Sequence, residues 1–238
     1  MKASRNITTV ILWILDNLCP PILRDCYPLM FPIYYAAYGK SAAKLLKYKD
    51  HYPTLSEEEY AAYYDCAAQT PLSSRPTDLN REGLHFILSH TAPGETCLDV
   101  GCGRGYLAKE LTRAGCAVTG MDIVRPKDYS AGDGYRFTVG NVEQIPFPDS
   151  SFDTVTCAHV LEHVRDMERS ISELLRVAKK RVLIVLPRQR EYRYVADLHV
   201  RYFPYLYNVQ LAIPIAGAQI QRVGSDWGVL IEKTPDQE

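Results

Sequence analysis

The sequence predicts an α/β fold: a mostly parallel seven-stranded sheet flanked by helices, with an antiparallel C-terminal hairpin and a helical N-terminal cap. Three observations support this prediction. From residue 96 onward, short apolar runs alternate with helical stretches, which is typical of parallel sheets covered by helices. The last two apolar runs have no helix between them and therefore indicate a hairpin. The first 90 residues instead read as helices interrupted by prolines.

The N-terminal segment, residues 1–90, is expected to form a helical cap that serves as a substrate lid. Residues 7–18 place apolar side chains on one helical face, which favours a helix that packs on the protein or covers the substrate. A weak membrane-surface contact and a signal peptide stay open as alternatives, but the run is too short to cross a bilayer. Ser56 and Glu59 have the spacing of a capping box at the start of a further helix.

The C-terminal segment, residues 91–238, is expected to contain the sheet. Its predicted strands, in chain order, are 96–100, 117–123, 135–140, 152–160, 181–187, 218–224 and 228–233. Helices are predicted at 105–115 and 166–180. Right-handed crossovers bring the carboxyl ends of parallel strands to one edge of the sheet, where ligands bind in such folds. Residues 188–215 are the expected substrate-binding insertion.

Composition narrows the possible partners. A net charge of −1 over 238 residues provides no general attraction to nucleic acid or to an anionic membrane. The seven cysteines form no C-x-x-C pair, so neither a disulfide framework nor a zinc site is indicated. Reduced thiols fit a cytoplasmic location. Composition therefore gives no indication of a nucleic-acid partner, and the sequence does not determine the oligomeric state.

The stretch LDVGCGRGY, residues 98–106, places three glycines directly after an apolar run. A glycine loop between a strand and a helix brings backbone N–H groups against a ligand. A dinucleotide loop, as in a Rossmann dehydrogenase, would need its third glycine where this chain has Tyr106. Asp99, just ahead of the loop, would repel a pyrophosphate and attract a cation. The loop therefore indicates a cofactor that carries positive charge.

Three segments, LDVGCGRGYLAKEL, VTGMDI and GNVEQIPFPDSSFDTVTCAHVLEHVRD, resemble in order the motifs of class I S-adenosylmethionine (SAM)-dependent methyltransferases of the small-molecule type. The resemblance covers residues 96 to about 186 and implies a Rossmann-like sheet with SAM as cofactor and S-adenosylhomocysteine as product. It implies methyl transfer to a small molecule such as a sugar or glycolipid precursor or an aromatic natural product. A non-catalytic SAM-binding regulator or partner subunit is the alternative.

The same resemblance assigns cofactor roles. Asp99 is expected to face the methionine ammonium, Asp122 to accept both ribose hydroxyls, and Ile123 to pack on adenine. Asn141 stands where the family often has an acid, so it either contacts the adenine amine or closes a turn. The full predicted cofactor set is Asp99, Gly101, Cys102, Gly103, Asp122, Ile123, Asn141, Val142 and Ala158.

Oxygen is favoured as the methylated atom, because the chain offers histidines that could act as the general base that oxygen nucleophiles often need. His163 is the first candidate, with His159 and His199 as further ones; helix packing beside the cofactor is their alternative role. Adjacent Glu and His side chains alone do not predict a metal site, and none is predicted. The insertion supplies four candidate substrate-binding residues, which could equally form plain surface: Arg193, Tyr194, Arg201 and Tyr202.

Overall fold

The structure is a computed structural model that describes residues 14, 18–68, 77–126, 129–191, 193–194 and 197–233. The chain divides into two compact units: unit 1 is Met1–Arg75 with Arg190–Val200, and unit 2 is Pro76–Gln189 with Arg201–Glu238. The division near residue 75 precedes the expected end of the cap at residue 90, because helix α7 (Arg81–Ser89) contacts the sheet of unit 2. Of the predicted first helix, only Ile14 and Leu18 are among the described residues.

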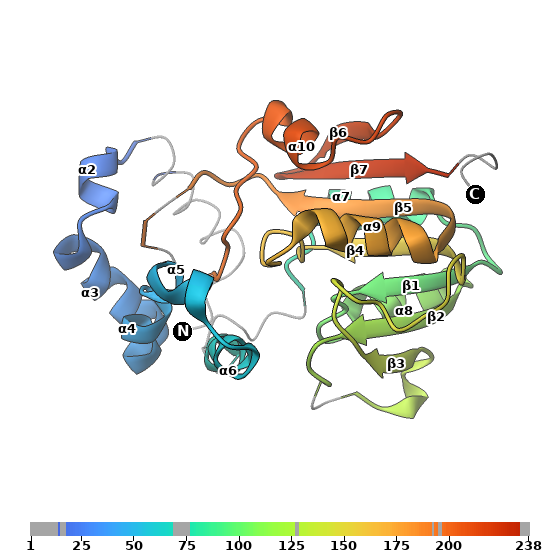
Figure 1. The fold of residues 1–238 in the computed structure, drawn as a ribbon, viewed down its shortest axis with the longest axis horizontal. Helices are drawn as coiled ribbons and strands as arrows, with labels where there is room; N and C mark the ends of the chain where they lie inside the picture. The colour runs from blue at the N-terminus through green and yellow to red at the C-terminus, as the bar shows by residue number, and fades with distance from the viewer. Residues whose placement is uncertain are drawn as a thin grey trace. The chain divides into compact units, whose positions relative to one another are not determined.

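Unit 2 contains the predicted seven-stranded sheet. Its strands are β1 (Thr96–Val100), β2 (Ala117–Asp122), β3 (Arg136–Val139), β4 (Phe152–Ala158), β5 (Ala178–Pro187), β6 (Gln219–Val223) and β7 (Asp226–Glu232). They lie in the order β3-β2-β1-β4-β5-β7-β6 (Figure 1). The first five are parallel, and β7 is antiparallel to both of its neighbours. The predicted parallel sheet with its C-terminal hairpin is thus confirmed.

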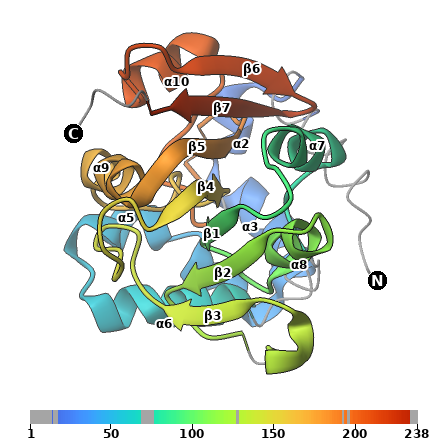
Figure 2. The same cartoon turned by 90° about the vertical axis from the view of Figure 1, so that its right-hand side faces the viewer.

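Helices cover both faces of this sheet. Besides α7, the unit has α8 (Tyr106–Arg113), η4 (Ala131–Asp133), α9 (Met167–Val177) and α10 (Leu206–Ala212). Helices α7 and α8 lie on one face and α9 on the other (Figure 2). Each face of the sheet has its own apolar core. The core beneath α7 and α8 includes Phe86 and Leu111. The core beneath α9 includes Ile171 and Leu174. The strands are therefore buried on both sides, which explains their nearly continuous apolar sequence.

The predicted boundary between the second helix and the fifth strand was wrong. The sequence predicts a helix over residues 166–180, but α9 ends at Val177 and β5 begins at Ala178. Ala178 has extended backbone angles and pairs with Phe152 of β4. Sheet pairing with β4 overrides the helical propensity of the two lysines that follow.

Unit 1 consists of short helices and a return segment. They are α2 (Pro21–Arg24), α3 (Tyr27–Tyr38), η1 (Gly39–Ser41), α4 (Ala42–Leu45), α5 (Tyr48–His51), η2 (Tyr52–Thr54) and α6 (Glu57–Ala68). Their core contains Leu45, Tyr48 and Tyr63, joined by Leu198 from the return segment. The capping box at the start of α6 is present: Ser56 N donates to Glu59 Oε2 at 2.8 Å, and Glu59 N donates to Ser56 Oγ at 3.2 Å. Within the part of the chain that the structure describes, no helix combines the length and apolar character needed to cross a bilayer.

Candidate active site

The glycine loop follows β1 and is fastened to β2. The backbone N–H groups of Gly101 and Cys102 donate to the carbonyl oxygen of Met121 at 2.7 and 3.0 Å. The next N–H, that of Gly103, donates to Asp122 Oδ2 at 2.8 Å. These bonds hold the loop against the end of β2. The structure therefore brings together five of the predicted cofactor residues: Asp99, Gly101, Cys102, Gly103 and Asp122.

The three glycines of the loop are required for different reasons, although all have positive φ angles, of 69°, 50° and 75°. A Cβ on Gly101 would lie 2.1 Å from Val160 Cγ2, and one on Gly105 would lie 2.1 Å from Tyr135 Oη. Packing within the protein therefore excludes any side chain at these two positions. A Cβ on Gly103 would meet no atom within 4 Å. Only Gly103 leaves its backbone open for a ligand to approach.

Asp99 is a buried carboxylate with one oxygen unsatisfied. Oδ1 accepts a hydrogen bond from Thr156 Oγ1 at 2.9 Å. Oδ2 is buried and has no hydrogen-bond partner among the described residues. Burial, and to a smaller extent the charge of Asp122, raise the pKa of Asp99 to about 7. A buried acceptor without a donor is costly, so the site suits a ligand that brings a positively charged donor.

Asp122 ends β2 and faces the same loop. Its carboxylate accepts from Gly103 N at 2.8 Å and from Val124 N at 3.3 Å, while burial raises its pKa. The next two side chains are apolar and exposed: Ile123 is 38% and Val124 is 44% accessible. A fixed carboxylate thus stands beside uncovered apolar surface, an arrangement that can bind a ligand with hydroxyl groups next to a flat ring.

Three further predicted cofactor residues, Asn141, Val142 and Ala158, lie in different environments. Asn141 Oδ1 accepts from Glu143 N at 2.9 Å, so this side chain closes a turn. The side chain of Val142 is buried in the core that underlies α9, which leaves only its backbone for a ligand. Ala158 ends β4, is half-buried and packs against the core beneath α7 and α8.

His159 lies in the loop after β4 between two carboxylates. Its Nδ1 is 3.5 Å from Glu162 Oε1, and its Nε2 is 3.3 Å from Asp226 Oδ2; the latter contact is an ion pair rather than an aligned hydrogen bond. Burial by itself would lower the pKa of His159, but Asp226 and Glu162 outweigh it and raise this pKa to about 10. The two carboxylates therefore favour the protonated imidazole, and the role of His159 as a general base stays a prediction.

The network around His159 includes residues that sequence reasoning missed. Asp226 Oδ2 also accepts from Asn80 Nδ2 at 2.7 Å. The other end of the Asn80 amide accepts from Gly83 N at 2.6 Å and so caps α7. Asn80 precedes a helix in the sequence, which predicts a cap, but nothing local points to its contact with Asp226, which is 146 residues away.

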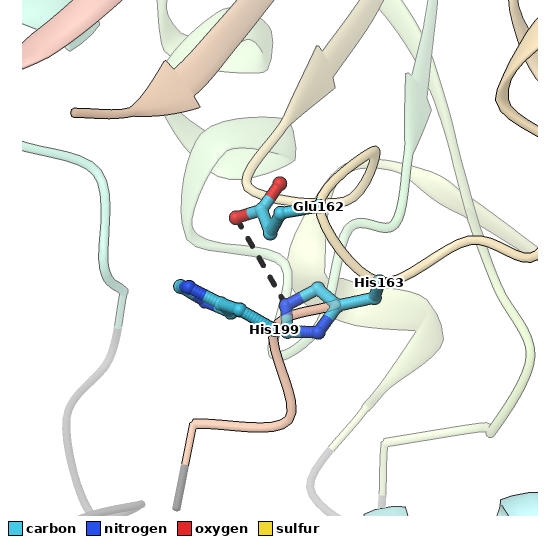
Figure 3. Close-up of side chains that lie close together, drawn as sticks. All are labelled: Glu162, His163 and His199. Atoms are coloured by element: carbon cyan, nitrogen blue, oxygen red, sulfur yellow. Dashed lines mark ion pairs between the residues drawn. The ribbon is translucent and has the colours of Figure 1, made fainter. Parts of the chain in front are cut away.

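Glu162 and His163 follow directly in this loop. Glu162 is fully buried, and its Oε1 lies 3.9 Å from His163 Nε2 (Figure 3). The imidazole of His163 retains 19% of its accessible surface. A carboxylate beside an imidazole can stabilise a positive charge on the ring, and the role of His163 as a general base stays a prediction. The third predicted base, His199, belongs to unit 1, where its Nδ1 lies 3.3 Å from Asp197 Oδ2.

Arg201 has a different environment from the one expected of a substrate-binding residue. Its guanidinium donates to the carbonyl oxygens of Val164 and, at 2.7 Å, Arg165. Its backbone N–H donates to Glu162 O at 3.2 Å. These three bonds hold the loop that carries Glu162 and His163. Tyr202, the next residue, is half-buried in unit 2.

The other two predicted substrate residues belong to unit 1. The guanidinium of Arg193 lies 5.4 Å from the ring centroid of Tyr194, and that ring meets Tyr27 edge-on at 5.3 Å. An open cavity of about 440 Å³ adjoins Arg193 in the same unit, and its lining is almost wholly charged. The lining residues are Asp25, Lys49, Asp50, Glu191 and Arg193.

Comparison with known families gives one match, of residues 98–186 to the family described as "Methyltransferase domain". A ubiquinone biosynthesis O-methyltransferase of Hahella chejuensis is 35% identical over 111 residues, which are 43% of this chain and 47% of that protein. A malonyl-[acyl-carrier protein] O-methyltransferase of Serratia marcescens is 30% identical over 122 residues, 50% of this chain and 45% of that protein. A sterol 24-C-methyltransferase of Gibberella zeae is 37% identical over 97 residues, 37% of this chain and 26% of that protein. The chain spans less than half the length of each of these relatives.

Among solved structures, the 1,6-didemethyltoxoflavin-N1-methyltransferase of Burkholderia thailandensis superposes with a TM-score of 0.63 at 20% identity. The match covers 76% of this chain and 92% of that one. That structure holds 1,6-didemethyltoxoflavin and S-adenosylhomocysteine. At this identity the similarity concerns the fold, which agrees with the strand order found in unit 2.

Proposed function

Residues 98–186 of this chain are a class I SAM-dependent methyltransferase domain, and we propose that the protein transfers the methyl group of SAM to a small molecule. The observation that carries this proposal is the pairing of a buried, unsatisfied Asp99 Oδ2 with open space beside the backbone of Gly103. Both lie where β1 and β2 end, the edge at which ligands bind in such sheets.

The residues of this edge fit SAM. Asp99 would accept from the α-ammonium group, which would give its buried oxygen a charged donor. Asp122 accepts two backbone hydrogen bonds and retains lone pairs for the ribose hydroxyls, with exposed Ile123 available to pack on adenine. When bound, SAM supplies a methyl group activated by its sulfonium. The work left to the protein is to orient the nucleophile and exclude water.

We favour oxygen as the methylated atom, with His163 as the general base. This choice is supported by the position of His163 beside buried Glu162, at 3.9 Å, and by the O-methyltransferases among the similar proteins. In this mechanism His163 takes the proton of a substrate hydroxyl, and Glu162 stabilises the imidazolium that results. Protonated His159 keeps Glu162 in place from the other side.

The substrate is a polar small molecule, either a sugar or glycolipid precursor or an aromatic natural product. Unit 1 supports this choice with the stacked pair Arg193 and Tyr194 and with its tyrosine-rich core. We therefore assign cofactor binding to unit 2 and part of the substrate binding to unit 1. The seven free thiols are in keeping with a reducing, cytoplasmic location.

The first test is calorimetric titration of the purified protein with SAM, followed by assay of S-adenosylhomocysteine after incubation with a host extract. Asp99→Asn and Asp122→Asn should each weaken SAM binding, whereas Glu110→Gln, which alters an exposed ion pair, should leave it unchanged. His163→Ala should keep SAM affinity and lower turnover by roughly 10²- to 10⁴-fold. Absence of any SAM binding would contradict the proposal. Binding without product over a broad substrate panel would favour a non-catalytic SAM-binding regulator.

A further inference from the structure

Helix α3 has an unusual composition for a helix at a protein surface. Its twelve residues, YPLMFPIYYAAY, include no charged side chain. A helix that is apolar all round is normally buried in a protein core or in lipid. A surface helix would instead carry polar residues on its solvent face.

The outer face of α3 is nevertheless exposed. Leu29 is 50% and Ile33 is 55% accessible, and they lie one helical turn apart. Pro32 and Ala36, which share this face by spacing, are exposed as well. All four residues are apolar, so the side of α3 that faces solvent is an uninterrupted apolar stripe.

The opposite face of α3 packs inward, so the exposed face is the outer face of a helix that already buries its other side. Met30 is only 4% accessible, and Tyr34 stacks on Tyr38 and packs against the core of unit 1. The helix thus has a well-defined inner face and still exposes its outer face.

Helix α2, which contacts α3 (Figure 1), extends this exposed apolar area. Ile22 is 81% and Leu23 is 45% accessible, and Leu18 just before α2 is 65% accessible. We call these side chains the α2–α3 surface: Leu18, Ile22, Leu23, Leu29 and Ile33. Exposed apolar patches of this kind mark sites of protein or membrane interaction.

The distribution of charged residues along the chain favours an anionic membrane over a second copy of this chain. Residues 1–50 contain seven basic and three acidic residues, whereas the rest of the chain contains 20 basic and 25 acidic ones. Two of the basic residues, Lys40 and Lys47, are exposed shortly after α3. An exposed apolar face in a segment with an excess of basic residues complements an anionic lipid surface. A second copy of this chain would instead bring two positively charged segments together.

We propose that the α2–α3 surface docks on an anionic lipid bilayer, with its apolar side chains in the interfacial region, and that Lys40 and Lys47 add attraction to the anionic headgroups. The contact lies on the membrane and does not span it, in keeping with the absence of a membrane-crossing helix among the described residues. This inference does not depend on methyl transfer, because the test below measures lipid binding alone.

The test is flotation of the full chain with phosphatidylcholine vesicles, either pure or mixed with phosphatidylglycerol. The wild type should float with the mixed vesicles and be released as salt is raised, because exposed charges are screened. The variant Ile22→Ser/Leu29→Ser/Ile33→Ser should bind weaker by roughly tenfold or more. Lys40→Gln/Lys47→Gln should lose the preference for anionic vesicles.

The matched control is Val139→Ser/Tyr207→Ser/Leu211→Ser, which alters three side chains in unit 2 that are 59%, 56% and 76% accessible. This variant should float like the wild type. If the triple variant of unit 1 does not fold, Ile22→Ser alone, at the most exposed position of the surface, gives the same comparison. The proposal is overturned if the wild type does not float, if both triple variants lose binding equally, or if the unit 1 variant keeps full binding. A dimer that the unit 1 variant disrupts, without any vesicle binding, would show that a second copy covers this surface.

Discussion

Two glycines of the loop after β1 are expected to have different roles: Gly101 is required for packing, and Gly103 leaves space for a ligand. Gly101→Ala would drive a Cβ to within 2.1 Å of Val160 Cγ2, and it should destabilise the fold by roughly 2–4 kcal/mol through overpacking and left-handed strain. Gly103→Ala meets no neighbour, so it should cost only about 1–2 kcal/mol of strain while it weakens SAM binding. Thermal melting and calorimetric titration of the two variants check this. Equal losses of SAM affinity and of stability in both would contradict the separation.

Asp99 should make SAM binding depend on pH. Since burial raises its pKa to about 7, the unliganded carboxyl is mostly protonated at pH 6 and ionised at pH 8. A cationic group at Oδ2 favours the ionised form, so SAM binding at pH 6 should release up to one proton, and affinity should rise from pH 5 to pH 7. Titration at pH 6 in two buffers of different ionisation enthalpy measures the release. The variant Asp99→Asn should release no proton when it binds SAM. An equal proton release from the wild type and from this variant would exclude Asp99 as the source.

The loop between β4 and α9 is held by charge. His159 lies between Glu162 and Asp226, and its pKa in the folded protein is raised from 6.5 to about 10. Its contribution to the free energy of unfolding is therefore full below pH 6.5 and is lost as the pH rises through about 10. Arg201 fastens the same loop through backbone carbonyls. The loop should therefore be rigid at neutral pH and loosen in alkali.

This pH dependence can be measured by thermal melting. The difference in melting temperature between the wild type and His159→Gln should be largest near pH 6 and should narrow toward pH 10, as the imidazolium of the wild type loses its proton. His85→Gln, an exposed position on α7, serves as the control and should show no such trend. A difference that stays constant from pH 6 to pH 10 would mean that His159 is not charged in the folded protein.

The division into two units is the basis of our proposal that cofactor and substrate are bound by different parts of the molecule. Each predicted cofactor residue belongs to unit 2, whereas Arg193, Tyr194 and the tyrosine-rich core belong to unit 1. Tyr48, which is 1% accessible, is the largest fully buried side chain of that core. Tyr48→Ala should destabilise unit 1 by roughly 3–5 kcal/mol. Since no predicted cofactor residue lies there, SAM affinity should stay within about twofold of the wild type, and turnover should fall.

The control for this variant is Tyr207→Ala, which removes an exposed tyrosine of unit 2. It should change neither stability nor turnover. If Tyr48→Ala abolished SAM binding, cofactor binding would depend on unit 1 and the assignment of tasks would be wrong.

Most of unit 2 was predictable because its determinants are local. Apolar runs and their spacing predicted seven strands and the hairpin, and all seven are present. Asp99 and Asp122 stand at strand ends, and the parallel direction of β1 and β2 places them near one loop. The helix boundary at Val177 was not predictable, because pairing of β5 with β4 decided it. The boundary between the two units near residue 75 was not predictable either, because it depends on the contact between α7 and the sheet.

The sequence by itself determined the sheet, the glycine loop and the two acids, because periodicity and strand ends can be read from neighbouring residues. Only the tertiary structure decided what the glycines and histidines do. Gly101 is needed because of Val160, and the pKa of His159 is raised by Glu162 together with Asp226, a residue of the distant hairpin. Such contacts join segments far apart in the chain. Their effect on charge depends on burial and distance, which no local pattern of residues records.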